Sequence, residues 1–200
     1  MFENFKINEY FLYFLVLITI AFVLCAVPME IKSSTKQKVI VNFAEPINSV
    51  KWILVNDNVM GGVSRSSVRI NPEGNMEFNG NVSLQYGGGF ASVRSSYANW
   101  EIGNFDGFVI KVWGDGKTYQ FRCRMGNNFN GVAYRQFFQT NNENWQEIRL
   151  PFSKFVPTYR GRIISDVTPL DPKAIRNLGL MISDKQSGNF NLKIAWIGVY

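Results

Sequence analysis

The sequence predicts an all-β fold, a β-sandwich, for most of this 200-residue chain. The first observation is composition: 17 Phe, 5 Trp and 8 Tyr are spread among 17 Gly, which suits half-buried strands joined by tight turns. The second is that no long stretch after residue 38 has helical periodicity. The third is that short apolar runs recur between turn signals, at the spacing of a sandwich. A chain of this length has room for about one such domain.

The predicted strands are short runs with alternating or continuous apolar patterns. Turn residues separate them, for example the Gly-Asp-Gly at 114–116 and the Asn-Pro-Glu-Gly at 71–74. The predicted strands cover residues 39–43, 50–55, 67–71, 76–78, 82–86, 90–95, 108–113, 118–125, 132–140, 145–150, 178–183 and 190–200. The three glycines at 87–89 are predicted to be a hairpin connection or a bulge, because no phosphate-loop Lys-Ser or Lys-Thr follows them.

The N-terminal part of the chain is predicted to be a membrane segment. Residues 11–27 carry no charge and would reach about 25 Å as a helix, which predicts a transmembrane anchor, with a cleaved signal peptide as the alternative. Residues 1–10 form its flank, residues 28–38 a polar linker and residues 39–200 the β-sandwich domain. Lys32, Lys36 and Lys38 follow the apolar run and place the domain on the cytoplasmic side rather than outside the cell.

The absence of histidine limits the kinds of catalytic and metal site that the chain can form. Histidine triads, histidine general bases and histidine metal sites are excluded. Four aspartates are candidate catalytic acids: Asp57, Asp106, Asp115 and Asp184. All stand in turn-like contexts, where a carboxylate usually caps backbone groups. We therefore predict a protein that is not an enzyme, with no catalytic residue, no metal and no cofactor.

The run 119–125 predicts a strand with two different faces. Strand alternation places Tyr119 and Cys123 in the core and puts Arg122 and Arg124 on the opposite, exposed face. With Arg135 in the following strand, these arginines are predicted to form a basic surface that binds a polar or acidic partner. The alternative is an ordinary solvated sheet face. The net charge of +6 is modest and its cations are scattered, which argues against nucleic acid as a partner.

Residues 56–62, Asn-Asp-Asn-Val-Met-Gly-Gly, predict a shaped loop. Asn56 and Asp57 can hydrogen-bond the local backbone, and Gly61 and Gly62 can adopt dihedral angles closed to other residues. The loop offers too few oxygen ligands for a calcium site, because it contains a single carboxylate. The remaining interpretations are a partner-binding loop that includes Met60, or a purely structural turn.

Five segments resemble the successive motifs of the complex I intermediate-associated protein 30 family. They are WILVNDNVMGGVS at 52–64, GGGFASVRS at 87–95, GDGKTYQFRCR at 114–124, NWQEIRLPFSKFVPTYRGR at 144–162 and LGLMISDKQSGNFNLKIAWI at 178–197. The resemblance implies a jelly roll like the galactose-binding domain. In mitochondrial members it implies a chaperone-like role in assembling NADH:ubiquinone oxidoreductase. The apolar segment stands where those members carry an Arg-rich presequence, which favours a bacterial membrane protein.

The resemblance also singles out arginines within its motifs. Arg94 and Arg160 are candidate partner-binding residues, with pairing to Asp57, Asp106 or Asp184 as the structural alternative. The predicted function is a non-enzymatic assembly factor that binds protein subunits of a membrane complex and is held to the membrane through residues 11–27. One alternative is a carbohydrate-binding module that uses some of the 5 Trp, and another is RNA or anionic-lipid binding. The oligomeric state is left open.

Overall fold

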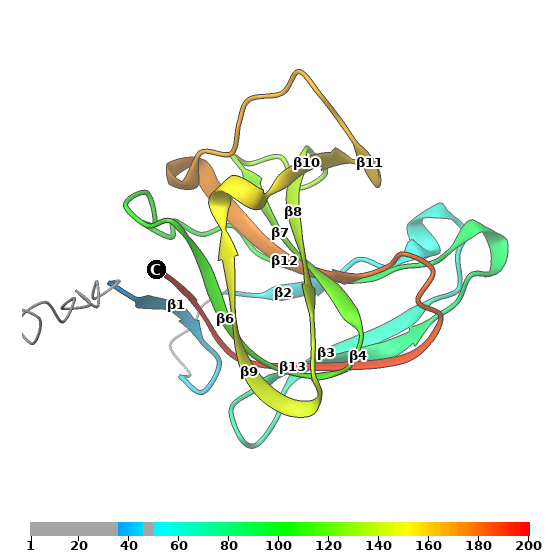
Figure 1. Ribbon diagram of the computed structural model, residues 1–200. Helices are drawn as coiled ribbons and strands as arrows, with labels where there is room; N and C mark the ends of the chain where they lie inside the picture. Colours follow the sequence, from blue (N-terminus) through cyan, green and yellow to red (C-terminus); the bar gives the residue numbers. More distant parts are fainter. Residues whose placement is uncertain (1–35, 46–49) are drawn as a thin grey trace, which may run out of the picture. The chain divides into compact units, whose positions relative to one another are not determined.

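The strands of this protein pair antiparallel with their neighbours and form two sheets (Figure 1). The computed structural model describes residues 36–45 and 50–200, and residues 36–200 form one compact unit. The predicted membrane segment at 11–27 and its flank at 1–10 lie outside the described residues, as does most of the linker. Among the described residues, no helix has the length and apolar character needed to cross a membrane.

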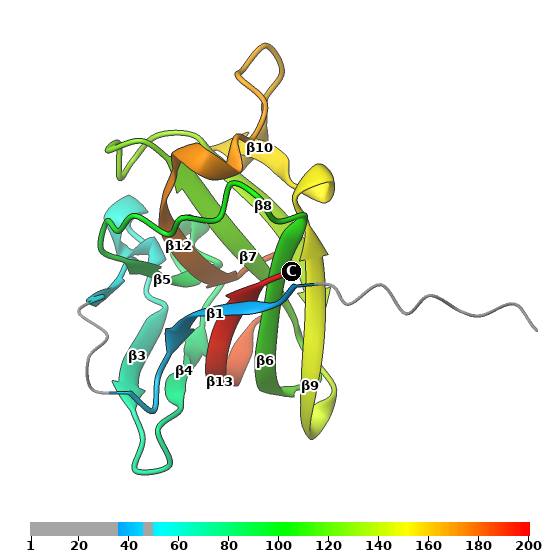
Figure 2. The same cartoon turned by 90° about the vertical axis from the view of Figure 1, so that its left-hand side faces the viewer.

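The first sheet has six strands. They run in the order β3-β4-β13-β6-β9, and β1 pairs with β13 beside that path. In Figure 2 these five strands lie side by side in that order. The bounds are β1 Lys38–Asn42, β3 Arg65–Ile70, β4 Met76–Val82, β6 Gly107–Asp115, β9 Asn142–Pro151 and β13 Gly188–Val199.

The second sheet has seven strands in the order β11-β10-β8-β7-β12-β5-β2. The bounds are β2 Trp52–Leu54, β5 Ala91–Ser95, β7 Thr118–Met125, β8 Ala133–Gln139, β10 Val156–Tyr159, β11 Arg162–Ile163 and β12 Ile175–Ile182. Four short 3-10 helices connect strands: η1 Asp57–Met60, η2 Gln85–Gly87, η3 Phe152–Lys154 and η4 Pro172–Ala174. The predicted all-β sandwich of two antiparallel sheets is confirmed.

The core lies between the two sheets. Phe108 of β6 packs on Phe121 of β7 with ring centroids 4.7 Å apart, and Tyr119 is fully buried on the same face of β7 as Phe121. Each large apolar side chain buried this way contributes about 1.5–3 kcal/mol to folding. Cys123 shares this face and is 0% exposed, as strand alternation predicted, and burial raises the pKa of its thiol.

Three local predictions are wrong. The run 82–86 is not a strand, because β4 ends at Val82 and the chain turns into η2, where Tyr86 has a φ of 54°. The glycines at 87–89 are neither a hairpin connection nor a bulge, since they lie outside the strands and lead from β4 in one sheet to β5 in the other. The hairpin of β10 and β11 was missed. Its turn residues Arg160 and Gly161 both have positive φ, 47° and 81°, which is the backbone of a two-residue hairpin loop.

Candidate functional site

The residues predicted as binding candidates fall into two separate groups. The first group consists of residues 57–62, which contain η1 and the turn after it, and residues 84–90, which contain η2. These two segments contact each other, and we call them the loop pair. Four arginines lie on the seven-stranded sheet, and we call Arg94, Arg122, Arg124 and Arg135 the arginine face. Arg160 belongs to neither group, because it lies in the turn between β10 and β11.

Asp57 holds the loop pair together. Its side chain is buried, and its Oδ1 accepts a hydrogen bond from the Ser64 backbone N–H at 2.9 Å. Its Oδ2 accepts from the Ser64 hydroxyl and from the backbone N–H groups of Gly89 at 2.7 Å and Phe90 at 3.3 Å. Burial alone would raise the pKa of Asp57, but these hydrogen bonds outweigh it and the pKa is lowered. Asp57 therefore has a structural role, because its carboxylate holds the two segments of the loop pair together.

Two glycines make room for this carboxylate. A Cβ on Gly62 would lie 2.4 Å from the Asp57 Cγ, and a Cβ on Gly88 would lie 2.6 Å from its Oδ2. Gly61 caps η1 with a φ of 91°, a conformation that glycine adopts without strain. Asn56 accepts a hydrogen bond from the Ser66 hydroxyl at 2.7 Å. Four of the five loop candidates therefore shape the loop, and Met60 alone is placed for contact.

The loop pair carries exposed apolar side chains. Val59 and Met60 on η1 are 68% and 69% exposed, and Tyr86 on η2 is 76% exposed. Leu84, just before η2, is also exposed. Figure 1 shows the two segments together at the right-hand end of the sandwich. Sequence reasoning missed Leu84 and Tyr86 because it placed them in a strand. Four hydrophobic side chains on two joined loops form a candidate contact surface.

The arginine face follows from strand register. Arg122 of β7 lies opposite Arg135 of β8 on one side and Gly179 of β12 on the other. Gly179 in turn lies opposite Arg94 of β5. Because partners in register point to the same side of a sheet, these arginines share the face turned away from the core. Arg124 is two residues along β7 from Arg122 and shares that face.

The prediction that Arg122 and Arg124 are exposed is wrong. They are 7% and 3% exposed, and their neighbour Gln120 is 1% exposed. The reason is that β7 is an inner strand, so side chains of β8, β10 and β12 close over it from both sides. Arg122, for example, contacts the Met181 sulfur at 3.3 Å and the Thr158 hydroxyl at 3.3 Å. Both faces of this strand are buried.

The partners of these arginines are neutral. Arg122 donates to the Gln120 Oε1 at 2.9 Å, and Arg124 donates to the Asn177 Oδ1 at 3.2 Å. Burial and the neighbouring arginine charges lower the pKa of Arg122 to about 10 and that of Arg124 to about 9. Both groups therefore remain cationic at neutral pH.

The outer arginines of this face rest on aromatic rings. Arg94 lies over Phe129 at 5.0 Å from the ring centroid and donates to its carbonyl oxygen at 3.1 Å. Arg135 lies over Phe137 at 4.8 Å. Among the ion pairs between described residues, none includes an arginine of this face, and none joins Arg94 or Arg160 to the aspartates proposed as their partners.

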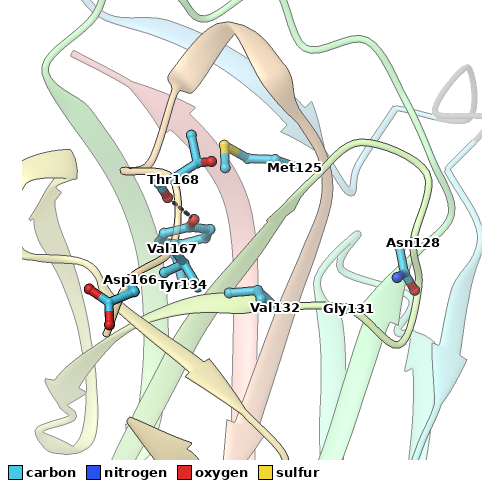
Figure 3. Close-up of a pocket in the computed structure, with 8 residues that line it drawn as sticks. All are labelled: Met125, Asn128, Gly131, Val132, Tyr134, Asp166, Val167 and Thr168. Atoms are coloured by element: carbon cyan, nitrogen blue, oxygen red, sulfur yellow. Dashed lines mark hydrogen bonds between the residues drawn. The ribbon is translucent and has the colours of Figure 1, made fainter. Parts of the chain in front are cut away.

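A pocket of about 350 Å³ lies at the end of the seven-stranded sheet (Figure 3). Tyr134 crosses it and donates a hydrogen bond from its hydroxyl to the Thr168 carbonyl oxygen. The other side chains around it are mainly apolar or amide, with Asp166 as the one carboxylate among its lining residues. The pocket places no pair of groups suited to acid-base chemistry.

The aspartates weighed as catalytic acids serve structural roles where their contacts are described. Asp115 accepts hydrogen bonds from the Tyr119 hydroxyl at 3.0 Å and from the Asn191 backbone N–H at 2.9 Å. Asp184 accepts from Gln120 Nε2 at 3.0 Å. No cluster of three acidic or cysteine side chains able to hold a metal occurs in the described part of the chain.

The tryptophans do not form an exposed row. Trp100 is 6% exposed, and Trp52 is half-buried against Phe43 with ring centroids 5.7 Å apart. Trp113 is half-buried beneath the Lys193 ammonium. Trp145 is the most exposed of the set at 37%. The argument for sugar stacking on tryptophan is weaker than the sequence indicated.

The architecture is similar to that of β-sandwiches in solved structures. A family 11 carbohydrate-binding module from Clostridium thermocellum matches with a TM-score of 0.59 and 16% identity, over 84% of this chain and 96% of that one. The agarase AgWH50C matches with a TM-score of 0.54 and 10% identity, over 82% of this chain and 24% of the enzyme. At these identities the likeness defines the fold class alone, an antiparallel β-sandwich.

The chain belongs to the Complex I intermediate-associated protein 30 (CIA30) family, whose model matches residues 41–194. A mouse relative, "Complex I intermediate-associated protein 30, mitochondrial", is 27% identical over 86% of this chain and 59% of its own length. A Caenorhabditis elegans relative, the "probable" protein of the same name, is 29% identical over 67% of this chain and 40% of its own. The alignments therefore span about 40–60% of these relatives' own length.

These comparisons correct the predicted localisation. A membrane-held chain with a cytoplasmic domain was expected, whereas the relatives of this family are named as mitochondrial proteins. The prediction failed because it was built on residues 11–27 and the lysines after them, and not on the domain that carries the family resemblance.

Proposed function

We propose that this chain is a non-enzymatic assembly factor that binds protein subunits of complex I before the complex is finished. Two facts support this proposal. The chain belongs to a family whose name associates its members with complex I intermediates. Its loop pair presents Val59, Met60, Leu84 and Tyr86 to solvent, and this exposed apolar surface is the observation that carries the proposal.

The chemistry of the loop pair suits a protein partner. Methionine and tyrosine are enriched at protein interfaces, where they supply large contact areas. Methionine is also flexible and adapts to irregular surfaces, which suits a subunit whose own packing is incomplete. In this proposal the chaperone-like activity consists of covering an apolar surface that later becomes buried inside the complex.

The loop pair is also fixed before a partner arrives. The Asp57 carboxylate ties η1 to the segment after η2 through the Gly89 and Phe90 backbone groups. A surface that is already ordered loses less conformational entropy on binding, so more of the contact energy appears as affinity. This arrangement supports specific binding of one partner surface rather than non-specific hydrophobic binding.

The test is affinity capture with the full-length chain and a double variant, Met60→Ser with Tyr86→Ser. We expect the wild type to capture complex I subunits and the double variant to lose most of them, while its circular dichroism and melting temperature stay unchanged. The matched control is Tyr159→Ser with Ile163→Ser, which removes two exposed apolar side chains, 41% and 66% exposed, from β10 and β11.

The control variant should capture the same subunits as the wild type. Equal capture by both double variants and the wild type would overturn the assignment of the loop pair. Cells that lack the chain should contain less assembled complex I, whereas complex purified from wild-type cells should keep its activity after the chain is removed. Normal complex levels in such cells would overturn the assembly function itself.

A further inference from the structure

The arginine face carries positive charge that the described residues do not balance. Arg122 and Arg124 are at least nine-tenths buried, and their recorded acceptors are amide, hydroxyl and thioether groups. Burying a cation is costly unless an anion or a full set of acceptors compensates it. These two cations therefore have no counter-charge in direct contact among the described residues.

Some of the donors on this face are unused. The Nε–H groups of Arg122 and Arg124 are both buried and have no hydrogen-bond partner among the described residues. Buried donors of this kind are rare in native proteins, because each one forfeits the bond it made with water. Two of them on adjacent outward positions of one strand indicate that an acceptor belongs there.

The route from Arg122 to a negative charge is indirect. Arg122 donates to the Gln120 Oε1, and the Gln120 Nε2 donates to the Asp184 Oδ2 at 3.0 Å. Asp184 therefore contributes only a weak, distant attraction, whereas the charges of Arg94 and Arg135 oppose that of Arg122. The face keeps a surplus of positive charge.

Gly179 lies between two of the arginines. It stands opposite Arg122 on one side and opposite Arg94 on the other, and it has no side chain to fill the row. A Cβ built on Gly179 would lie 3.5 Å from the Arg94 Cγ, so the stem of Arg94 runs close over this glycine. Arg94 and Arg122 are therefore neighbours across this glycine, on the same face of the sheet.

We propose that the arginine face binds a phosphate group through Arg94, Arg122 and Arg124. Guanidinium groups offer planar pairs of donors that match phosphate oxygens two at a time. Phosphate is favoured over carboxylate because a phosphate monoester carries about −1.5 to −2 charges at pH 7 and offers three acceptor oxygens. A single carboxylate would leave most of this charge unbalanced. The site is separate from the loop pair and does not depend on its function.

The test is calorimetric titration of the purified full-length chain with inorganic phosphate, against sodium chloride at matched ionic strength. We expect saturable binding of phosphate and none of chloride. Arg122→Met and Arg124→Met, which keep the length of the side chain, should each weaken binding roughly tenfold or more. Arg162→Gln removes the same charge from an exposed position on β11 and should bind like the wild type.

Further measurements distinguish a free phosphate ester from a lipid headgroup as the ligand. They also distinguish the phosphate site from the proposed function of the loop pair. Glycerol 3-phosphate tests a free metabolite, and phosphatidylcholine vesicles with and without phosphatidic acid test a lipid headgroup. Binding of either one that is lost in Arg122→Met supports the site. The Met60→Ser, Tyr86→Ser double variant should bind phosphate normally. Equal affinity of wild type and Arg122→Met, or binding only of a glutamate-rich peptide and of no phosphate, would overturn the proposal.

Discussion

Asp57 and Arg122 are both buried charges, yet their surroundings differ. The Asp57 carboxylate accepts four hydrogen bonds, including three from backbone N–H groups. Arg122 has neutral acceptors and one donor with no partner among the described residues. The comparison teaches that burial alone does not distinguish structural from functional charges. In this protein the charge whose hydrogen bonds are complete holds the loop pair together, and the charge whose bonds are incomplete belongs to the ligand site that we propose.

Glu77 on the six-stranded sheet supports the first half of this comparison. It is 8% exposed and accepts hydrogen bonds from Asn71 at 3.1 Å and Arg69 at 2.8 Å, with Lys193 at 4.0 Å. The hydrogen bonds from Asn71 and Arg69 lower the pKa of Glu77, against the opposing effect of burial. This carboxylate has its cations within the chain, so nothing about it indicates a ligand.

The largest expected effect is that of removing the Asp57 carboxylate. Asp57→Ala leaves the N–H groups of Gly89 and Phe90 and the Ser64 hydroxyl without their acceptor, and we expect a loss of about 3 kcal/mol in the free energy of unfolding. Urea denaturation of the full-length chain measures it. A loss below about 1 kcal/mol would show that the Asp57 carboxylate does not hold the loop pair together.

A smaller effect is expected from crowding the same carboxylate. Gly62→Ala places a Cβ against the Asp57 side chain, which must shift away from its donors, and we expect a loss of about 2 kcal/mol. Gly61→Ala is the matched control, because its Cβ would meet nothing within 4 Å and adds only the strain of a φ of 91°. That strain costs about 1 kcal/mol. Equal losses for both variants would mean that backbone strain, and not the carboxylate, sets the sequence of this turn.

The sequence predicted most of the fold because strand alternation is a local property. It correctly placed Tyr119 and Cys123 in the core, since each strand turns alternate side chains to opposite faces. It failed at residues 82–86, where a continuous run looked like a strand but Tyr86 has left-handed dihedral angles. A run of five residues holds too little information to separate a strand end from a turn.

The candidate sites could be predicted only in part, because their meaning depends on distant residues. Asp57 was recognised as a turn residue, but its acceptor role involves Gly89 and Phe90, more than thirty residues away. Alternation placed Arg122 and Arg124 on one face correctly and their exposure wrongly. Periodicity states which way a side chain points, and it does not state what the neighbouring strands place over it.

The smallest expected effect on stability has the opposite sign. Arg122→Met removes a buried cation that lacks a counter-charge and fills the same space with an apolar side chain. Exchanging buried ionic groups for apolar ones of similar volume is often neutral or stabilising, so we expect a gain of about 1 kcal/mol or no change. The measurement is urea denaturation without phosphate, beside Asp57→Ala.

Phosphate sharpens this last prediction, because a ligand that binds only the folded state stabilises it. Added phosphate should raise the unfolding free energy of the wild type and leave Arg122→Met unchanged, so the advantage of the variant should shrink or reverse. Arg162→Gln should follow the wild type in both conditions, since its charge lies on the exposed edge of the sheet. A loss of about 3 kcal/mol for Arg122→Met without phosphate would place Arg122 beside Asp57 as a structural charge. The distinction between complete and incomplete buried charges would then fail for this protein.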